Sequence, residues 1–273
     1  MVDVVSIVIA IVSLLGSLAA VGFTGWMSFY VDRKKKRSEA SDIKNYKYRD
    51  PLTLAAYDLQ SRLWGFVQGN IARYAEDEDK KDVVYIHTAF LFGQYLCWTY
   101  ILRRQTQFLR FTAGTDPATQ QFSRLMDNIS TEFAMDRNSH EQAFMLWRGH
   151  QMAIGELMTV KEDKELYCMG FAAFTAKYKF DPEFKKWFKP IETGILLLAE
   201  AGNNGNGNPA ATYRLRRLQH VLIDLVLHLD NHGGKSTNSQ MKVAAAPECR
   251  CDGCPGYVAT LPLMPPASKL PEP

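Results

Sequence analysis

The most constraining feature of this chain is an N-terminal stretch of 28 residues, between Asp3 and Asp32, that contains no charged residue. A helix needs about 20 apolar residues to cross about 30 Å of hydrocarbon, so this stretch is long enough to span a bilayer with some tilt. Trp26 and Tyr30 lie near its end, and such amphipathic rings favour the headgroup level. We therefore predict a transmembrane helix within residues 1–32.

Five consecutive cations follow the apolar stretch, namely Arg33, Lys34, Lys35, Lys36 and Arg37. Such a run marks the cytoplasmic side, so we expect an N-terminus outside and the bulk of the chain in the cytoplasm. The same residues are candidates for contact with anionic lipids, at about 1 kcal/mol per charge. A cleaved signal peptide fits less well, because Asp3 precedes the apolar run without any Lys or Arg, and the run is too long.

The composition supports a folded domain behind this anchor. Of the 273 residues, 47% are hydrophobic and 12% aromatic, which is enough for a real core. The net charge of +3, from 32 basic and 29 acidic side chains, is too small to indicate a nucleic-acid partner. We predict an all-α chain with a basic linker at 33–44, a cytosolic helical bundle at 45–232 and a disordered tail at 233–273, which is rich in proline and contains three cysteines.

Asp-Pro pairs predict where three helices begin, because Asp is a good N-cap and Pro suits the first helical position. They stand at Asp50-Pro51, Asp116-Pro117 and Asp181-Pro182, and the third helix should be short and end at Pro190. The stretch 144–160 remains open between a helix and a short strand leading into one. A last helix after Pro209 is predicted by a leucine stripe: Leu215, Leu218, Leu222, Leu225 and Leu229.

Residues 83–102 form a second uncharged run, which leaves two interpretations open. The run could cross the membrane, but it contains His87, Gln94 and Trp98 in positions that lipid would face. A helix that is apolar on most sides is more often the central helix of a soluble bundle. We favour that second interpretation.

Three segments resemble a group of uncharacterised single-pass membrane proteins. They are Pro51-Leu52 with Ala55-Ala56 and Asp58-Leu59-Gln60-Ser61-Arg62-Leu63, then Gly93-Gln94-Tyr95, then Ile154-Gly155-Glu156-Leu157-Met158. The resemblance covers the middle half of the chain. It implies an anchored, mainly helical cytosolic domain, and it carries no known activity and no functional residue.

The tail contains one tight cysteine motif, Cys249-x-Cys251-x-x-Cys254. Thiolates at this spacing can bind zinc, but a closed site needs four ligands. His228 and His232, four residues apart before the tail, are candidates for completing it. The competing interpretation is that His232 lies near the C-terminal end of its helix, where the helix dipole favours an imidazolium without any metal. We therefore expect no cofactor, with zinc as the alternative.

A second cluster interleaves lysines with aromatic residues, including Lys185, Lys186 and Trp187. Such a segment can rest on a membrane surface, towards which an anchor would hold it. The competing interpretation is a short helix whose aromatic rings face the core and whose lysines face water.

No catalytic motif is present in the sequence. It contains no Gly-x-Ser-x-Gly and no Glu-x-x-His. We therefore expect a non-enzymatic protein-interaction or assembly module at the membrane, with the bilayer and a second copy or another protein as partners. The first alternative is a sensor or enzyme for a lipophilic ligand, with a pocket near His87, Tyr95 and Trp98. The second alternative is metal binding through the tail.

Overall fold

A computed structural model describes residues 47–106, 117–136, 143–163, 165–203, 212–230 and 242–243, together with Met27 and Cys254. The chain divides into two compact units, Met1–Arg49 and Asp50–Pro273, and the elements below belong to the second, except for residues 47–49 of the first helix. Apart from Met27, the predicted anchor and the basic run at 33–37 lie outside the described residues. Among the residues that the structure describes, no helix combines the length and the apolar character needed to cross a membrane.

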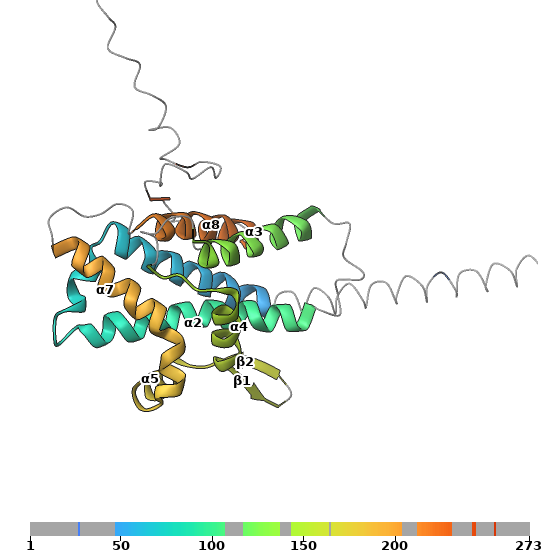
Figure 1. The fold of residues 1–273 in the computed structure, drawn as a ribbon. Coiled ribbons are helices and arrows are strands. Elements are labelled where there is room, and N and C mark those ends of the chain that lie inside the picture. The colour runs from blue at the N-terminus through green and yellow to red at the C-terminus, as the bar shows by residue number, and fades with distance from the viewer. Residues whose placement is uncertain are drawn as a thin grey trace, which may run out of the picture. The chain divides into compact units, whose positions relative to one another are not determined.

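The described part of the chain is mostly helical, as predicted (Figure 1). After a helix over 47–67 come η1 (Ile71–Ala75), α2 (Lys81–Thr106), α3 (Pro117–Ala134), α4 (Arg148–Leu157), β1 (Thr159–Glu162), β2 (Glu165–Cys168), α5 (Phe171–Phe180), α6 (Pro182–Lys185), η2 (Lys186–Phe188), α7 (Lys189–Asn203) and α8 (Tyr213–Leu229). The elements β1 and β2 form an antiparallel hairpin in which Val160 pairs with Tyr167. The stretch 144–160 thus contains a helix that leads into a strand, the reverse of the order we considered.

The central helix is α2, which contains the second uncharged run. It packs against α4, α7, η1 and α5, and Phe92, Cys97 and Ile101 on it are fully buried. Burial on most sides explains why its sequence lacks a polar face. The interpretation of 83–102 as a core helix is therefore confirmed.

The helix over 47–67 lies between α2 and α8 (Figure 1). Arg62 Nε donates to Thr88 Oγ1 of α2 at 2.8 Å, and Gln219 Nε2 of α8 donates to Gln60 Oε1 at 3.2 Å. This helix is already formed at residues 47–50, so the predicted start at Asp50-Pro51 is wrong. Pro51 therefore lies within the helix, where it removes one backbone donor.

Helices α3 and α8 lie side by side (Figure 1). The start of α3 at Pro117 agrees with the predicted one, and four leucines of the α8 stripe are fully buried: Leu215, Leu218, Leu222 and Leu225. The buried Arg214 of α8 donates to the carbonyl oxygens of Phe133 and Met135, at 3.1 and 2.7 Å. The Phe133 carbonyl also accepts from the Leu146 backbone N–H at 2.8 Å, so Arg214 adds a second donor there and joins α8 to the end of α3.

Helices α5 to α7 enclose an aromatic cluster. Asp181 caps α6 as predicted, accepting a hydrogen bond from the Phe184 backbone N–H at 3.0 Å. The expected end at Pro190 is wrong, because α7 begins at Lys189 and a proline fits the first turn of a helix. Phe174 of α5 packs against Phe184 and against Phe188 of η2 with ring centroids 5.6 and 5.2 Å apart.

Candidate functional site

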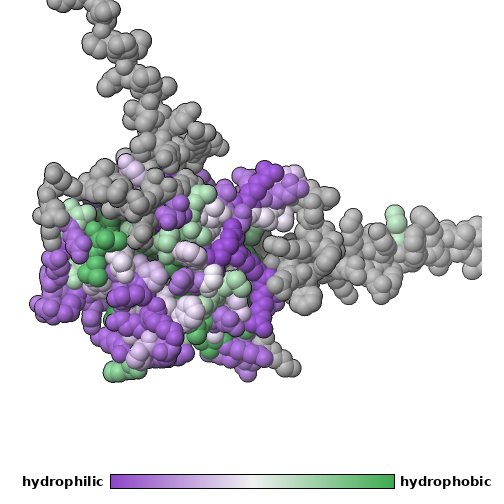
Figure 2. All heavy atoms as spheres, in the orientation of Figure 1, coloured by the Kyte–Doolittle hydropathy of each residue, from purple (hydrophilic) through white to green (hydrophobic). Residues whose placement is uncertain are grey.

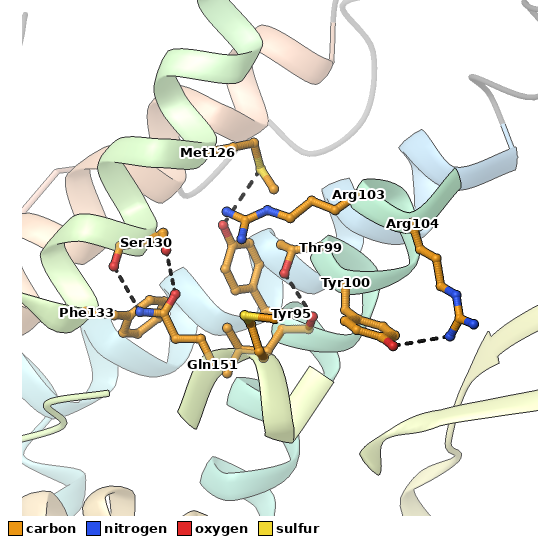
Figure 3. A pocket seen from close by; sticks show the side chains of 11 residues that line it. Tyr95, Thr99, Tyr100, Arg103, Arg104, Met126, Ser130, Phe133 and Gln151 are labelled. Carbon is orange, nitrogen blue, oxygen red and sulfur yellow. Dashed lines mark hydrogen bonds between the residues drawn. The ribbon is translucent and has the colours of Figure 1, made fainter. Parts of the chain in front are cut away.

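A cavity of about 280 Å³ lies where α2, α3 and α4 converge (Figure 3). Its size is close to the lower end of small-molecule pockets, which span about 300–1,000 Å³. It is lined by Tyr95, Leu96, Thr99, Tyr100, Arg103 and Arg104 of α2, Met126, Ser130 and Phe133 of α3, and Gln151 and Met152 of α4. We call it the α2–α4 cavity.

One wall of the α2–α4 cavity is held by a closed set of hydrogen bonds. Ser130 Oγ donates to Gln151 Oε1 at 2.7 Å, and Gln151 Nε2 donates to the carbonyl oxygens of Ser130 and Leu146 at 2.9 and 2.8 Å. Both amide protons of Gln151 are therefore used. This residue joins α4 to α3 rather than offering a donor to a ligand.

The buried hydroxyl of Tyr95 has only a weak partner in the cavity. It donates to Met126 Sδ at 3.9 Å, and a thioether is a poor acceptor. Burial raises the pKa of Tyr95 above its ordinary value, although the charge of Arg103 acts in the opposite direction. The phenol is therefore neutral at physiological pH and can donate to an oxygen of a bound molecule.

Two arginines in the last turn of α2 stand at the rim of the cavity. Arg103 extends towards the Tyr95 hydroxyl, while Arg104 turns the other way and donates to Tyr100 Oη at 3.2 Å (Figure 3). Both arginines are exposed. Among the described lining residues there is no Asp or Glu, so the arrangement favours a molecule with an acidic group and a short apolar part.

The sequence-based pocket hypothesis named three residues of α2, and one of them lies at the cavity. Tyr95 lines the cavity, whereas His87 and Trp98 do not. His87 lies two helical turns before Tyr95 and packs edge-on against Phe171, with ring centroids 5.7 Å apart. The arginines of the rim were missed because cations that flank an apolar run have the same sequence pattern as a solvated helix end.

The lysine and aromatic cluster has the arrangement of a helix surface. Phe184 and Phe188 are buried, and Trp187 is half-buried with its ring against that of His150. Lys185 pairs with Glu192 at 3.3 Å, and Lys186 pairs with Glu183. The aromatic rings thus face the interior and the lysines face water; contact with a membrane stays a prediction.

Helix α5, which precedes this cluster, has exposed residues that are mainly apolar. Phe180, at the end of α5, is 85% exposed, and Phe171 at its start is 45% exposed. Between them the exposed residues are Ala172, Ala173, Ala176, Lys177 and Lys179. We call these seven residues the α5 outer face. Figure 2 shows a small apolar patch amid hydrophilic side chains at this end of the domain.

The predicted metal ligands are only partly described. Cys249, Cys251 and His232 lie outside the described residues. His228 stacks on Phe122 of α3, with ring centroids 6.3 Å apart. Within the described residues, no group of three or more His, Cys, Asp or Glu side chains could hold a metal ion.

Cys254 lies instead beside a histidine that the sequence did not single out. Its Sγ is 3.7 Å from His220 Nδ1 of α8, and both residues are buried. His220 lies on the side of α8 opposite to Leu218 and Leu222, so the leucine stripe gave no sign that this side is covered. This second side of α8 is buried in part by its contact with Val243, whose carbonyl oxygen lies 2.6 Å from His220 Nε2. That contact cannot be read from the sequence.

Comparisons with known proteins add no relative: no protein-family model, curated protein or solved structure matches this chain. The resemblance of residues 51–63 to uncharacterised membrane proteins therefore carries no further argument. What the described residues define is a mostly helical domain with a cavity that has arginines at its rim, and function has to be argued from that geometry.

Proposed function

We propose that this chain is a membrane-anchored helical protein whose domain binds a small amphipathic anion in the α2–α4 cavity. The observation that carries the proposal is the position of Arg103, which extends towards the Tyr95 hydroxyl at the rim of a partly apolar cavity (Figure 3). A guanidinium group binds a carboxylate or phosphate through two parallel hydrogen bonds, and buried methionine and phenylalanine side chains accept a hydrocarbon part. The anchor itself rests on the uncharged stretch between Asp3 and Asp32.

The interior supports a particular orientation of the ligand. The acidic group stays at the rim, because the arginines there remain hydrated and need not be buried as ions. The apolar part lies against Leu96, Met126 and Phe133. A hydroxyl or carbonyl oxygen in the ligand could accept from Tyr95, whose present acceptor is only a thioether sulfur. We assign no reaction to the cavity.

The test uses octanoate as the probe, with full-length protein in detergent micelles and isothermal titration calorimetry. The double variant Arg103→Gln/Arg104→Gln is expected to weaken binding at least about tenfold, since a hydrogen bond to a charged group contributes about 1.5–3 kcal/mol. Octanol, which has the same chain without the charge, should bind more weakly to the wild-type protein.

Arg73→Gln is the matched control, because Arg73 is an exposed arginine on η1 that does not line the cavity. It should leave octanoate binding unchanged. Equal binding of octanoate and octanol, or full binding by the double variant, would contradict the proposal.

The α5 outer face supports a second candidate function, which is contact with an anionic bilayer surface. A phenylalanine that is 85% exposed is costly in water, and the neighbouring Lys177 and Lys179 suit acidic headgroups. Lys179 pairs with Asp82 at 2.7 Å, but both side chains are exposed, so this pair is weak. The anchor would keep the face at a high effective concentration near lipid.

Hydrogen exchange of α5 in nanodiscs tests this contact. We expect slower exchange over Phe171–Phe180 when phosphatidylserine is mixed into phosphatidylcholine discs, and loss of the difference in Phe180→Ser. The control is Leu227→Ser, which replaces another exposed apolar residue, on α8. The idea fails if α5 exchanges at the same rate in neutral and anionic discs.

An assembly module remains the expectation from sequence. Self-association would appear as a multimer in native mass spectrometry of the full-length protein, and a defined hetero-complex as one additional mass. In either case the α5 outer face would be the first surface to examine for protection.

A further inference from the structure

Two cysteines outside the tail meet where the central helix packs against the hairpin. Cys97 of α2 is fully buried, and Cys168 at the end of β2 is half-buried. Cys97 Sγ lies 3.4 Å from Thr159 Oγ1 of β1, and Thr159 is the residue directly opposite Cys168 in the hairpin. Side chains that are directly opposite in an antiparallel pair lie on the same face, with Cβ atoms about 4.5–5.5 Å apart. Both thiols therefore lie between the hairpin and α2, which pack against each other.

Thr159 determines the direction of the hydrogen bonds around Cys97. Its hydroxyl donates to the Gly155 carbonyl oxygen at 2.7 Å, and a hydroxyl has only one proton to donate. In the contact with Cys97, Thr159 Oγ1 is therefore the acceptor and the Cys97 S–H is the donor. The lone pairs of the Cys97 sulfur remain available to the thiol of Cys168.

The two thiols also influence each other's ionisation. A hydrogen bond from Cys168 lowers the pKa of the Cys97 thiol, while burial acts in the opposite direction. The same hydrogen bond, together with burial, raises the pKa of the Cys168 thiol. Cys97 is thus the one of the two that more readily becomes a thiolate, which is the form of cysteine that attacks another sulfur.

We propose that Cys97 and Cys168 form a reversible disulfide between α2 and β2 when a hydroperoxide reaches Cys168. Both residues are free thiols that packing already holds together, so the reaction requires no unfolding. Cys168 is the sulfur that a small oxidant meets first, because Cys97 is fully buried. The pair includes none of the residues that line the α2–α4 cavity and does not depend on the proposed anion binding.

The oxidation takes two steps. In the first, the Cys168 sulfur attacks an oxygen of the hydroperoxide and the O–O bond breaks, which gives a sulfenic acid and an alcohol, or water where the oxidant is hydrogen peroxide. In the second, the Cys97 sulfur attacks the Cys168 sulfur, the S–O bond breaks, and hydroxide leaves as water with the Cys97 proton. The two thiols lose two electrons and two protons in total, and one peroxide is reduced.

The disulfide would act as a switch on the hairpin. Oxidation joins β2 covalently to the central helix, and reduction releases it. In the cytoplasm, where we expect this domain, thiol reductants would open the bond again, and disulfides in that compartment are usually transient and catalytic or redox-sensing. The second step is intramolecular, so the burial of Cys97 does not prevent it.

Peptide mapping of full-length protein in detergent micelles, after treatment with hydrogen peroxide, tests the proposal. Trypsin cleaves after Lys81, Arg103, Lys164 and Lys177, so the peptides 82–103 and 165–177 contain one cysteine each. We expect these two peptides to be joined in the oxidised wild type and separate after treatment with dithiothreitol. They should also be separate in Cys97→Ser and in Cys168→Ser.

Cys254→Ser is the control variant, because it removes another buried free cysteine and should still give the joined peptides. Backbone amides of β2 should exchange more slowly in oxidised than in reduced wild-type protein. The decisive result comes from the wild type, so it does not depend on how well Cys97→Ser folds. Wild-type protein in which both thiols stay reduced would overturn the proposal, as would oxidation of Cys168 to a sulfinic acid without joined peptides, or a disulfide between either residue and a tail cysteine.

Discussion

Replacing Arg214 with methionine is expected to lower the free energy of unfolding by about 2–4 kcal/mol, since each hydrogen bond from a charged donor contributes about 1.5–3 kcal/mol. The guanidinium of Arg214 donates to the carbonyl oxygens of Glu132, Phe133 and Met135 at the end of α3. Methionine preserves much of the packing volume but supplies no donor. The loss therefore measures the hydrogen bonds between α8 and α3.

Thermal and urea unfolding followed by circular dichroism would measure this loss. The control is Arg124→Met, which removes an exposed arginine from α3 and should change stability by less than about 0.5 kcal/mol. Arg214→Lys should fall between the two, because an ammonium cannot reach all three carbonyls in the fork geometry of a guanidinium. Equal stability of Arg214→Met and Arg124→Met would show that these bonds contribute nothing net.

The parts of the fold that local sequence determines were predictable. Asp181-Pro182 caps and begins α6, and Pro117 begins α3, because capping depends on neighbouring residues alone. The leucine stripe of α8 predicted its buried side. The uncharged run at 83–102 predicted the central helix.

The β1–β2 hairpin was not predictable by the same means. Its strands are four residues each, and charged residues at 161–165 between Val160 and Leu166 hide any alternation. Asp163 at the turn has a φ of 44°, a left-handed conformation that Asp adopts more readily than most residues. A charged run of this kind is equally typical of an exposed turn without strands.

The candidate sites show a similar division. The spacing of the three tail cysteines is visible in the sequence, whereas the contact of Cys254 with His220 is not, because only folding brings position 220 beside position 254. The α2–α4 cavity likewise depends on three helices that are distant in the chain. The sequence-based hypothesis included Tyr95 but not the arginines at the rim of the cavity.

Gly155 is the position at which the packing of α4 on α2 is most sensitive to added volume. A Cβ at Gly155 would lie 2.7 Å from Tyr100 Cβ and 2.8 Å from the Leu96 carbonyl oxygen. The backbone oxygen cannot move aside as a flexible side chain can, so α4 would have to shift away from α2. Leu96 and Tyr100 both line the α2–α4 cavity, and the shift should therefore alter the cavity as well.

Gly155→Ala is accordingly expected to destabilise the domain by about 1–3 kcal/mol, the usual cost of overpacking, and to weaken octanoate binding. Gly149→Ala, in the same helix, is the matched control: nothing lies within 4 Å of its added Cβ, so better helix propensity should leave stability unchanged or raise it by up to about 1 kcal/mol. If Gly155→Ala lowers the stability of the domain while Gly149→Ala raises it, the close approach of α4 to α2, rather than helix propensity, requires glycine at position 155. If both variants were more stable than the wild type, the result would contradict the close packing of α4 on α2 and the shape of the α2–α4 cavity described above.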